Sequence, residues 1–214
     1  LQGSGTAGTA PKYGAVLKAC GLSETITPST SVTYAPISSS PTSTTIYYYA
    51  DGLFHKLTGC RGTVDMTCKV GEVPVLSFDM TGLYNSPSDV ALPSATYTQP
   101  SPVIFNKANT PNFSVYSYSG ALESIDFKLT NDLQYRELVG GTKEVMLVDR
   151  KPAGTFSIEA PSIATKDFFS AAIGSATGGL SFTHGTVAGS IVSFNSPQTD
   201  LQAPTYSDMN GTVS

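Results

Sequence analysis

Apolar and polar residues alternate along much of this chain. In residues 63–70 and 76–81 every second position is apolar, while the positions between them are polar. A period of two is typical of a strand with one buried face and one solvated face. The polar side of the pattern consists of Thr63, Asp65, Thr67, Lys69, Ser77, Asp79 and Thr81.

A four-stranded meander is predicted over residues 43–83. Asp51-Gly52 is a strong hairpin signal, and it separates strands expected at 43–50 and 53–58. Strands at 63–70 and 75–83 complete the set. Large side chains occupy every position of residues 46–49, so we expect this strand to be covered on both faces.

The remaining chain alternates less regularly. A short helix is expected from the capping residue Thr9 to Gly21, and residues 23–30 are rich in turn formers. A second helix near Thr165 is expected to bury four apolar side chains, Phe168, Phe169, Ala172 and Ile173. Gly140-Gly141 predicts another hairpin. Strands are expected at 113–118, 124–130, 135–139, 143–148, 155–160, 180–184 and 189–194.

Residues 85–112 interrupt the strand pattern with many Pro, Ser, Thr and Asn residues. At most a short strand at 103–105 is expected there. Loops of this length are uncommon unless they bind something or are mobile. We interpret the segment as an arm that contacts other subunits, with a mobile loop as the alternative. The contact residues proposed for it are Pro87, Pro93, Tyr97, Pro100, Phe105 and Pro111.

These patterns predict one all-β domain over residues 1–214, with minor helices. An antiparallel β-sandwich or flattened barrel with short helices on its flank is the economical arrangement. Residues 1–10 are expected to form a flexible N-terminal arm. The chain starts at Leu1 without Met and stops in the strand-like residues 211–214, so we expect both termini to be trimmed.

Composition narrows the functional classes. Only 13% of residues are charged, the net charge is −4, and no basic cluster occurs. A protein that grips nucleic acid needs clustered cations, so such a role is not expected. No apolar stretch is long enough to cross a membrane. Three cysteines in no zinc-like spacing are expected to be buried free thiols.

The sequence offers no catalytic motif. His55 and His184 are the only histidines, and we expect both to be exposed or half-buried on strands. No nucleophile elbow accompanies them. Acidic residues are dispersed singly, and Asn131-Asp132 lacks a second acidic residue at calcium-loop spacing. We therefore expect no catalytic site, cofactor or metal.

Low charge, flexible flanks and a long arm indicate a protein that contacts neighbouring subunits, because burying few charges costs little. An alternative is a secreted or surface sandwich, such as an adhesin or a carbohydrate-binding module, with Tyr47, Tyr48 and Tyr49 stacking on sugars.

Several patches resemble the tail tube (major tail) proteins of long-tailed bacteriophages. They are PKYGAVLKACGL at 11–22, YYYADGLFHKLTGCRG at 47–62, FDMTGLY at 78–84, GTVAG at 185–189 and PTYSDMNG at 204–211. The resemblance implies a sandwich subunit of hexameric rings, which stack into a hollow conduit for DNA during ejection. A tube of a contractile injection or secretion system shares this architecture and is a further alternative.

The resemblance also implies partners and a location. The partners are other copies of the chain, the tape measure, terminator and baseplate proteins, and double-stranded DNA in transient passage, with no membrane. The expected location is the virion tail, assembled in the host bacterial cytoplasm. Four strands from each of six subunits would form an inner barrel. About 24 strands spaced about 4.8 Å and tilted about 40° give a backbone diameter of roughly 45–50 Å.

The resemblance assigns a role to the two features described above. We expect residues 43–83 to supply the inner strands and the seven polar residues of their alternating pattern to face the lumen. Residues 85–112 are expected to make the contacts between subunits.

Overall fold

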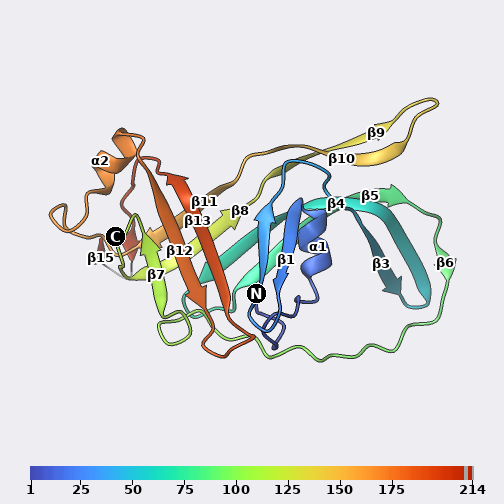
Figure 1. Cartoon of the computed structure of the whole chain (residues 1–214), viewed down its shortest axis with the longest axis horizontal. Helices are drawn as coiled ribbons and strands as arrows, with labels where there is room; N and C mark the ends of the chain where they lie inside the picture. Colours follow the sequence, from blue (N-terminus) through green and yellow to red (C-terminus); the bar gives the residue numbers. More distant parts are fainter. Residues whose placement is uncertain (210–211, 214) are drawn as a thin grey trace.

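Antiparallel strands dominate the computed structural model, which describes residues 1–209 and 212–213 (Figure 1). The prediction of an all-β fold with minor helices is confirmed. The described strands form open sheets and do not close into a barrel, so the sandwich arrangement applies to the single chain.

The largest sheet has six strands in the order β11-β8-β4-β3, with β5 and β6 paired to the other edge of β4. Its centre is the long strand β4, which pairs with β3 through its first part and with β8 through its last part. The strands are β3 (Thr44–Ala50), β4 (Leu53–Lys69), β5 (Val75–Tyr84), β6 (Ser88–Asp89), β8 (Leu122–Lys128) and β11 (Ala153–Ile158).

The Asp51-Gly52 hairpin is confirmed, because Ala50 pairs with Leu53 across these two residues. Both turn residues have positive φ, 45° and 87°, which is the type I′ signature. The predicted four-stranded meander is wrong, since residues 53–58 and 63–70 belong largely to one continuous strand. At Gly59 (φ 62°) the register against β5 shifts, so a bulge replaces the expected turn.

A smaller sheet, β13-β12-β7, covers part of one face of the large sheet (Figure 1). Its strands are β7 (Asn112–Val115), β12 (Thr177–His184) and β13 (Val192–Asp200). The core between the two sheets includes Met66 and Cys68 from β4, Ile125 from β8 and Phe182 from β12. This pair of sheets is the sandwich.

The same face of β4 and β5 is covered by helix α1 (Gly14–Ala19) and by the hairpin of β1 (Leu22–Thr27) and β2 (Ser31–Pro36). Leu17 packs there with Val64 and Phe78. Thr9 does not cap the helix, which begins after Tyr13 without a side-chain cap. Gly21 ends it with φ 77°, as predicted.

Helix α2 (Phe168–Ile173) begins after Asp167, whose carboxylate accepts a hydrogen bond from the Ser170 amide. Its Phe168 is buried, but Phe169 is 37% exposed and Ile173 is 86% exposed. The prediction that all four apolar residues point inward is therefore wrong. The strand β1 was also missed, because residues 23–30 contain both the strand and its turn.

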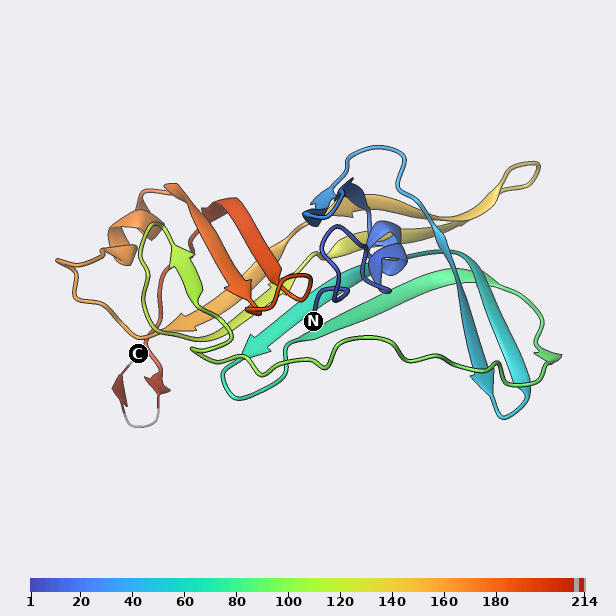
Figure 2. The same ribbon diagram turned by 60° about the horizontal axis from the view of Figure 1, so that its bottom comes forward.

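The hairpin of β9 (Asn131–Glu137) and β10 (Lys143–Arg150) projects beyond the large sheet (Figures 1 and 2). Its turn lies at Gly140-Gly141, as predicted. At its base the Asn131 amide donates to the carbonyls of Cys20 and Gly62, both at 2.7 Å. The Asn131 amide oxygen accepts a 3.0 Å hydrogen bond from Arg150 Nε.

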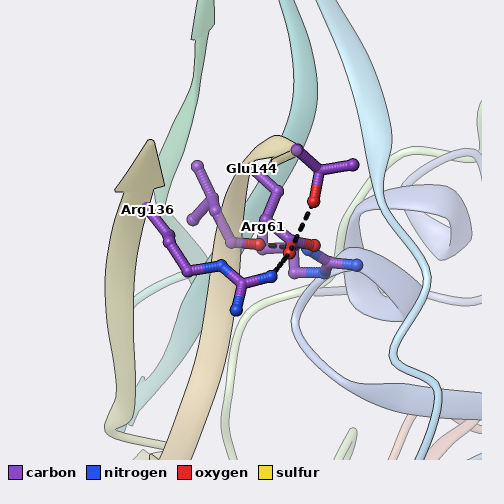
Figure 3. A network of polar contacts seen from close by, with 5 residues as sticks. Arg61, Arg136 and Glu144 are labelled. Atoms are coloured by element: carbon purple, nitrogen blue, oxygen red, sulfur yellow. Dashed lines mark hydrogen bonds and ion pairs between the residues drawn. The ribbon is translucent and has the colours of Figure 1, made fainter. Parts of the chain in front are cut away.

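Arg61 of β4 joins the sheet to this hairpin (Figure 3). Its guanidinium donates to the Val145 carbonyl on β10 and, at 3.1 Å, to the Pro41 carbonyl ahead of β3. Nearby, Arg136 of β9 binds Glu144 of β10 at 2.5 Å. The Arg61 contacts hold the hairpin beside the part of β4 that lies between the segments paired with β3 and with β8, and the Arg136–Glu144 pair joins the two strands of the hairpin.

The first ten residues, expected as a flexible N-terminal arm, lie against the body of the subunit. The Leu1 amino group donates to the Pro74 carbonyl, and Gly5 donates to the Gly189 carbonyl. At the other end, β14 (Asp208–Met209) pairs with β15 (Thr212–Val213). Asn210, Gly211 and Ser214 lie outside the described residues, and two of them, Gly211 and Ser214, belong to the strand-like stretch at 211–214.

Candidate functional site

The predicted alternation on β4 and β5 is confirmed. Val64, Met66 and Cys68 are buried beneath the covering elements. Among the seven polar residues predicted to share the other side, five are exposed and two, Thr63 and Asp65, are half-buried. The cross-strand register pairs Thr63 with Asp79 and Asp65 with Ser77, so the side chains of the two strands lie on one face.

This polar face continues onto two strands that the sequence analysis did not connect with it. Asp65 pairs with Lys128 and Thr67 with Asp126, which brings β8 alongside β4. Asp126 in turn pairs with Thr155 on β11. The face therefore spans β5, β4, β8 and β11, and its additional residues are Ser124, Asp126, Lys128, Thr155 and Ser157. Their alternation was visible in the sequence, but their long-range pairing was not.

Opposite charges on the polar face nearly balance. The carboxylates of Asp65, Asp79 and Asp126 face the solvent side with the amines of Lys69 and Lys128. Arg61, in the same row as Thr81, also belongs to this face, and its guanidinium binds the Val145 and Pro41 carbonyls. The remaining positions are Ser and Thr, apart from Val75 and Ala153. Such a surface offers hydrogen bonds but no cationic patch that could hold a polyanion.

Both outer strands of the polar face have a free edge. Within the described residues, β5 pairs with β4 alone and β11 pairs with β8 alone. The backbone groups on the outer side of each strand are therefore available to another chain.

The arm of residues 85–112 starts beside the β3–β4 hairpin and returns along the β5 side of the large sheet (Figure 2). Val90 donates to the Gly52 carbonyl at one end, and Phe105 donates to the Glu72 carbonyl at the other. Within the described residues the arm makes no backbone hydrogen bond to β5. The expected strand at 103–105 does not form.

The predicted arm residues differ in exposure. Tyr97 is 92% exposed, and Pro87, Pro93 and Pro111 are also exposed. Pro100 is half-buried beside Gly5. Phe105 is 2% exposed because its ring belongs to the sandwich core, so assigning it to a contact between subunits is wrong.

The end of the β3–β4 hairpin carries uncovered aromatic residues. Tyr47 is 55% exposed and Tyr48 is 64% exposed, so the prediction that this strand is covered on both faces is wrong for the single chain. The Tyr47 ring stacks on Phe54 with 5.4 Å between centroids, and Tyr48 lies 6.0 Å from His55. This apolar surface is available to a neighbouring subunit.

The titratable groups do not form a reactive cluster. His55 is half-buried as expected, but His184 is 1% exposed, which corrects the expectation for it. Its Nδ1 lies 3.0 Å from the Thr110 hydroxyl, and burial lowers its pKa. The three cysteines are free and buried, as predicted. Burial raises the pKa of Cys20 to about 12, which keeps that thiol protonated and unreactive.

Among the described residues, no group of three or more His, Cys, Asp or Glu side chains is placed to hold a metal ion. No helix in the same part of the chain is long and apolar enough to span a bilayer.

A family model described as phage tail tube protein matches residues 1–213. The chain belongs to the phage tail tube protein family. No curated protein matches it. Because members of this family are structural proteins of the phage tail, this tail tube protein is a virion component and not an enzyme.

Proposed function

We propose that six copies of this tail tube protein form a ring, that the rings stack into a hollow tube, and that DNA passes through it during ejection. The polar face of β5, β4, β8 and β11 lines the channel. Each ring makes permanent contacts with the neighbouring rings and with the tape measure, terminator and baseplate proteins. Double-stranded DNA is a transient partner. Assembly takes place in the host cytoplasm.

One observation carries this proposal: the large sheet has one face covered by its own chain and one bare polar face. α1, the β1–β2 hairpin and the β7–β12–β13 sheet all lie on the apolar side. A sheet face that stays solvated in the assembled tube must point either outward or into the channel. We infer that these covering elements form the outer side of the tube, which leaves the bare face as the channel wall.

The strand count suits a channel of the right width. The polar face has four strands, β5, β4, β8 and β11, which replace the expected meander of residues 43–83 as the inner set. Six copies supply about 24 strands, and tilting them by about 40° gives a backbone diameter of roughly 45–50 Å. Side chains reduce the opening to roughly 35–40 Å, which leaves room for a duplex about 20 Å wide.

The charge of this wall suits a sliding polyanion. DNA is held when Lys and Arg neutralise its phosphates and release counterions. On the polar face Arg61, Lys69 and Lys128 are matched by Asp65, Asp79 and Asp126, and the Arg61 guanidinium is bound to the Val145 and Pro41 carbonyls. Phosphates therefore meet a surface without excess positive charge, which does not hold DNA in place.

The exposed arm and the aromatic end of the β3–β4 hairpin provide contacts between subunits. Tyr97 and Leu92 of the arm are 92% and 62% exposed, and Tyr48 of the hairpin is 64% exposed. Low charge over these surfaces reduces the desolvation cost of burying them against another copy.

The test changes the charge of the channel wall and measures DNA ejection. In phage tails built from the double variant Asp79→Lys, Asp126→Lys, we expect slower ejection that recovers as salt concentration rises. The control is Asp149→Lys, whose exposed side chain lies on β10 outside the polar face. Equal ejection rates for the wall variant, the control and the unmodified tail would contradict the proposal.

A further inference from the structure

We propose, building on the ring assembly above, that the joint between neighbouring copies is an antiparallel strand pair. The free edge of β5 in one copy pairs with the free edge of β11 in the next. We also infer its register, which is offset by four or six residues along the strands. Both statements follow from strand order, strand direction and the spacing of a tilted barrel.

The partner at each edge is fixed by the order of strands. The polar face runs β5-β4-β8-β11, and its two outer edges are unpaired within the described residues. Copies related by rotation about the tube axis meet head to tail, so each joint brings two different edges together. β5 of one copy therefore meets β11 of its neighbour, and no exposed edge remains around the ring.

The direction of pairing follows from the same rotation. Each neighbouring pair in the polar face is antiparallel, so β4 and β11 run one way while β5 and β8 run the other. Rotation about the tube axis does not reverse a strand along that axis. The β5–β11 joint is consequently antiparallel, like the pairs within each copy.

The register follows from the tilt. Within one copy, Ser77 of β5 lies in the same row as Asp65, Lys128 and Ala153. Four strands spaced about 4.8 Å and tilted about 40° displace the next copy by about 16 Å along the strands, or about five residues at about 3.3 Å each. Side chains keep to their own faces only when the displacement is even, which leaves four or six residues.

The next copy can be displaced along β5 in only one direction. β5 continues for seven residues beyond Ser77, to Tyr84, whereas it begins only two residues before it. Only a shift toward Tyr84 gives β11 a strand to pair with. A four-residue offset places Thr155 opposite Asp79 and Ser157 opposite Ser77. A six-residue offset places Thr155 opposite Thr81 and Ser157 opposite Asp79.

Both registers match side chains across the joint. Phe156, which points to the apolar side of β11, meets Phe78 in the first register and Met80 in the second. All three side chains are only partly buried in the single chain, so pairing removes further apolar surface from water. On the polar side, Asp79 faces a hydroxyl residue in either register, and no like charges oppose each other.

Disulfide trapping tests the joint. The double variant Asp79→Cys, Thr155→Cys reports the four-residue register, and Thr81→Cys, Thr155→Cys reports the six-residue register. We expect oxidation of assembled tubes to give a covalent ladder with one of the two. Within one copy these positions are separated by at least about 14 Å, three strand spacings, so they cannot bridge internally.

The antiparallel direction of the β5–β11 joint is tested by a second pair of cysteine substitutions in the same register. Ser77→Cys, Ser157→Cys must also cross-link in the four-residue register, and Asp79→Cys, Ser157→Cys in the six-residue register. The control is Thr67→Cys, Thr155→Cys, since Thr67 lies inside the sheet on β4. The native cysteines are buried and give no background.

The results distinguish a failure of the β5–β11 joint from a failure of the proposed tube function. Tubes in which neither register cross-links would overturn the joint and leave the tube intact. Absence of rings and tubes from the unmodified chain would contradict the proposed function itself. A double variant that does not assemble is replaced by two single variants, Thr155→Cys and either Asp79→Cys or Thr81→Cys, mixed into tubes of mainly unmodified protein. Oxidation of these mixed tubes must yield covalent dimers. A lack of dimers would refute the joint.

Discussion

Phe105 fixes the return of the arm into the body, so truncating it is expected to destabilise the subunit itself. The ring is 2% exposed and makes an edge contact with Phe182, with centroids 5.9 Å apart. It also lies 5.6 Å from the His184 ring. Its amide and carbonyl bind Glu72 and Gly71 at 2.8 and 2.9 Å. Phe105→Ala keeps the backbone hydrogen bonds and removes the ring.

The magnitude follows from this burial. A fully buried Phe truncated to Ala loses its transfer free energy and leaves a cavity, which together cost about 3–5 kcal/mol. For a domain of this size each kcal/mol lowers Tm by about 2–4 °C, so we expect a decrease of about 6–20 °C. Tyr97→Ala is the matched control, because Tyr97 is an arm aromatic that is 92% exposed. Its expected effect on the free energy of unfolding is within about 0.5 kcal/mol.

The assay is urea and thermal unfolding of the purified monomer, combined with limited proteolysis of the arm. Phe105→Ala should unfold at lower urea and be cleaved faster within residues 91–104. A variant as stable as the unmodified chain, yet unable to assemble, would refute this reasoning and return Phe105 to the contact between subunits.

Three further outcomes are expected. Asn131→Leu leaves the Cys20 and Gly62 carbonyls and Arg150 Nε without their partner, and should lower the free energy of unfolding by about 2–4 kcal/mol in urea titrations; a loss below about 0.5 kcal/mol would contradict this. Burial lowers the pKa of His184, so the unfolded chain binds its proton first, and stability should fall as pH drops below about 6.5. His184→Gln should flatten urea midpoints measured between pH 7.5 and 5.5, and an unchanged pH dependence would count against it. Replacing Leu92, Tyr97 and Val103 together with Ser should leave monomer unfolding within about 1 kcal/mol of normal but abolish tubes in electron micrographs, because all three are exposed on the arm; normal tubes would remove the arm from assembly.

The sequence was most informative where a pattern is local. The alternation in β4 and β5 identifies their buried and polar faces, because side-chain direction in a strand depends only on position. Asp51-Gly52 and Gly140-Gly141 likewise identify their hairpins, since the turn conformation needs particular residues. The family resemblance, confirmed by the match to residues 1–213, identified the chain as a structural tail tube protein.

Features that depend on distant partners were not predictable. The glycines at 59 and 62 resemble a turn, yet pairing with β3 and β5 on either side keeps β4 continuous through them. β8 and β11 show the right alternation, but nothing local indicates that they extend the polar face. Phe105 lies in a Pro-rich stretch that resembles a surface loop, and only the position of β12 explains its burial.

The most direct measurement is a cryo-electron microscopy reconstruction of the assembled tube at a resolution that separates strands. We expect a continuous inner barrel in which Thr67, Asp79, Asp126 and Thr155 point into the channel and β5 of each subunit pairs with β11 of the next. A channel wall formed by α1 and the β7–β12–β13 sheet, with the polar face directed outward, would contradict the proposal.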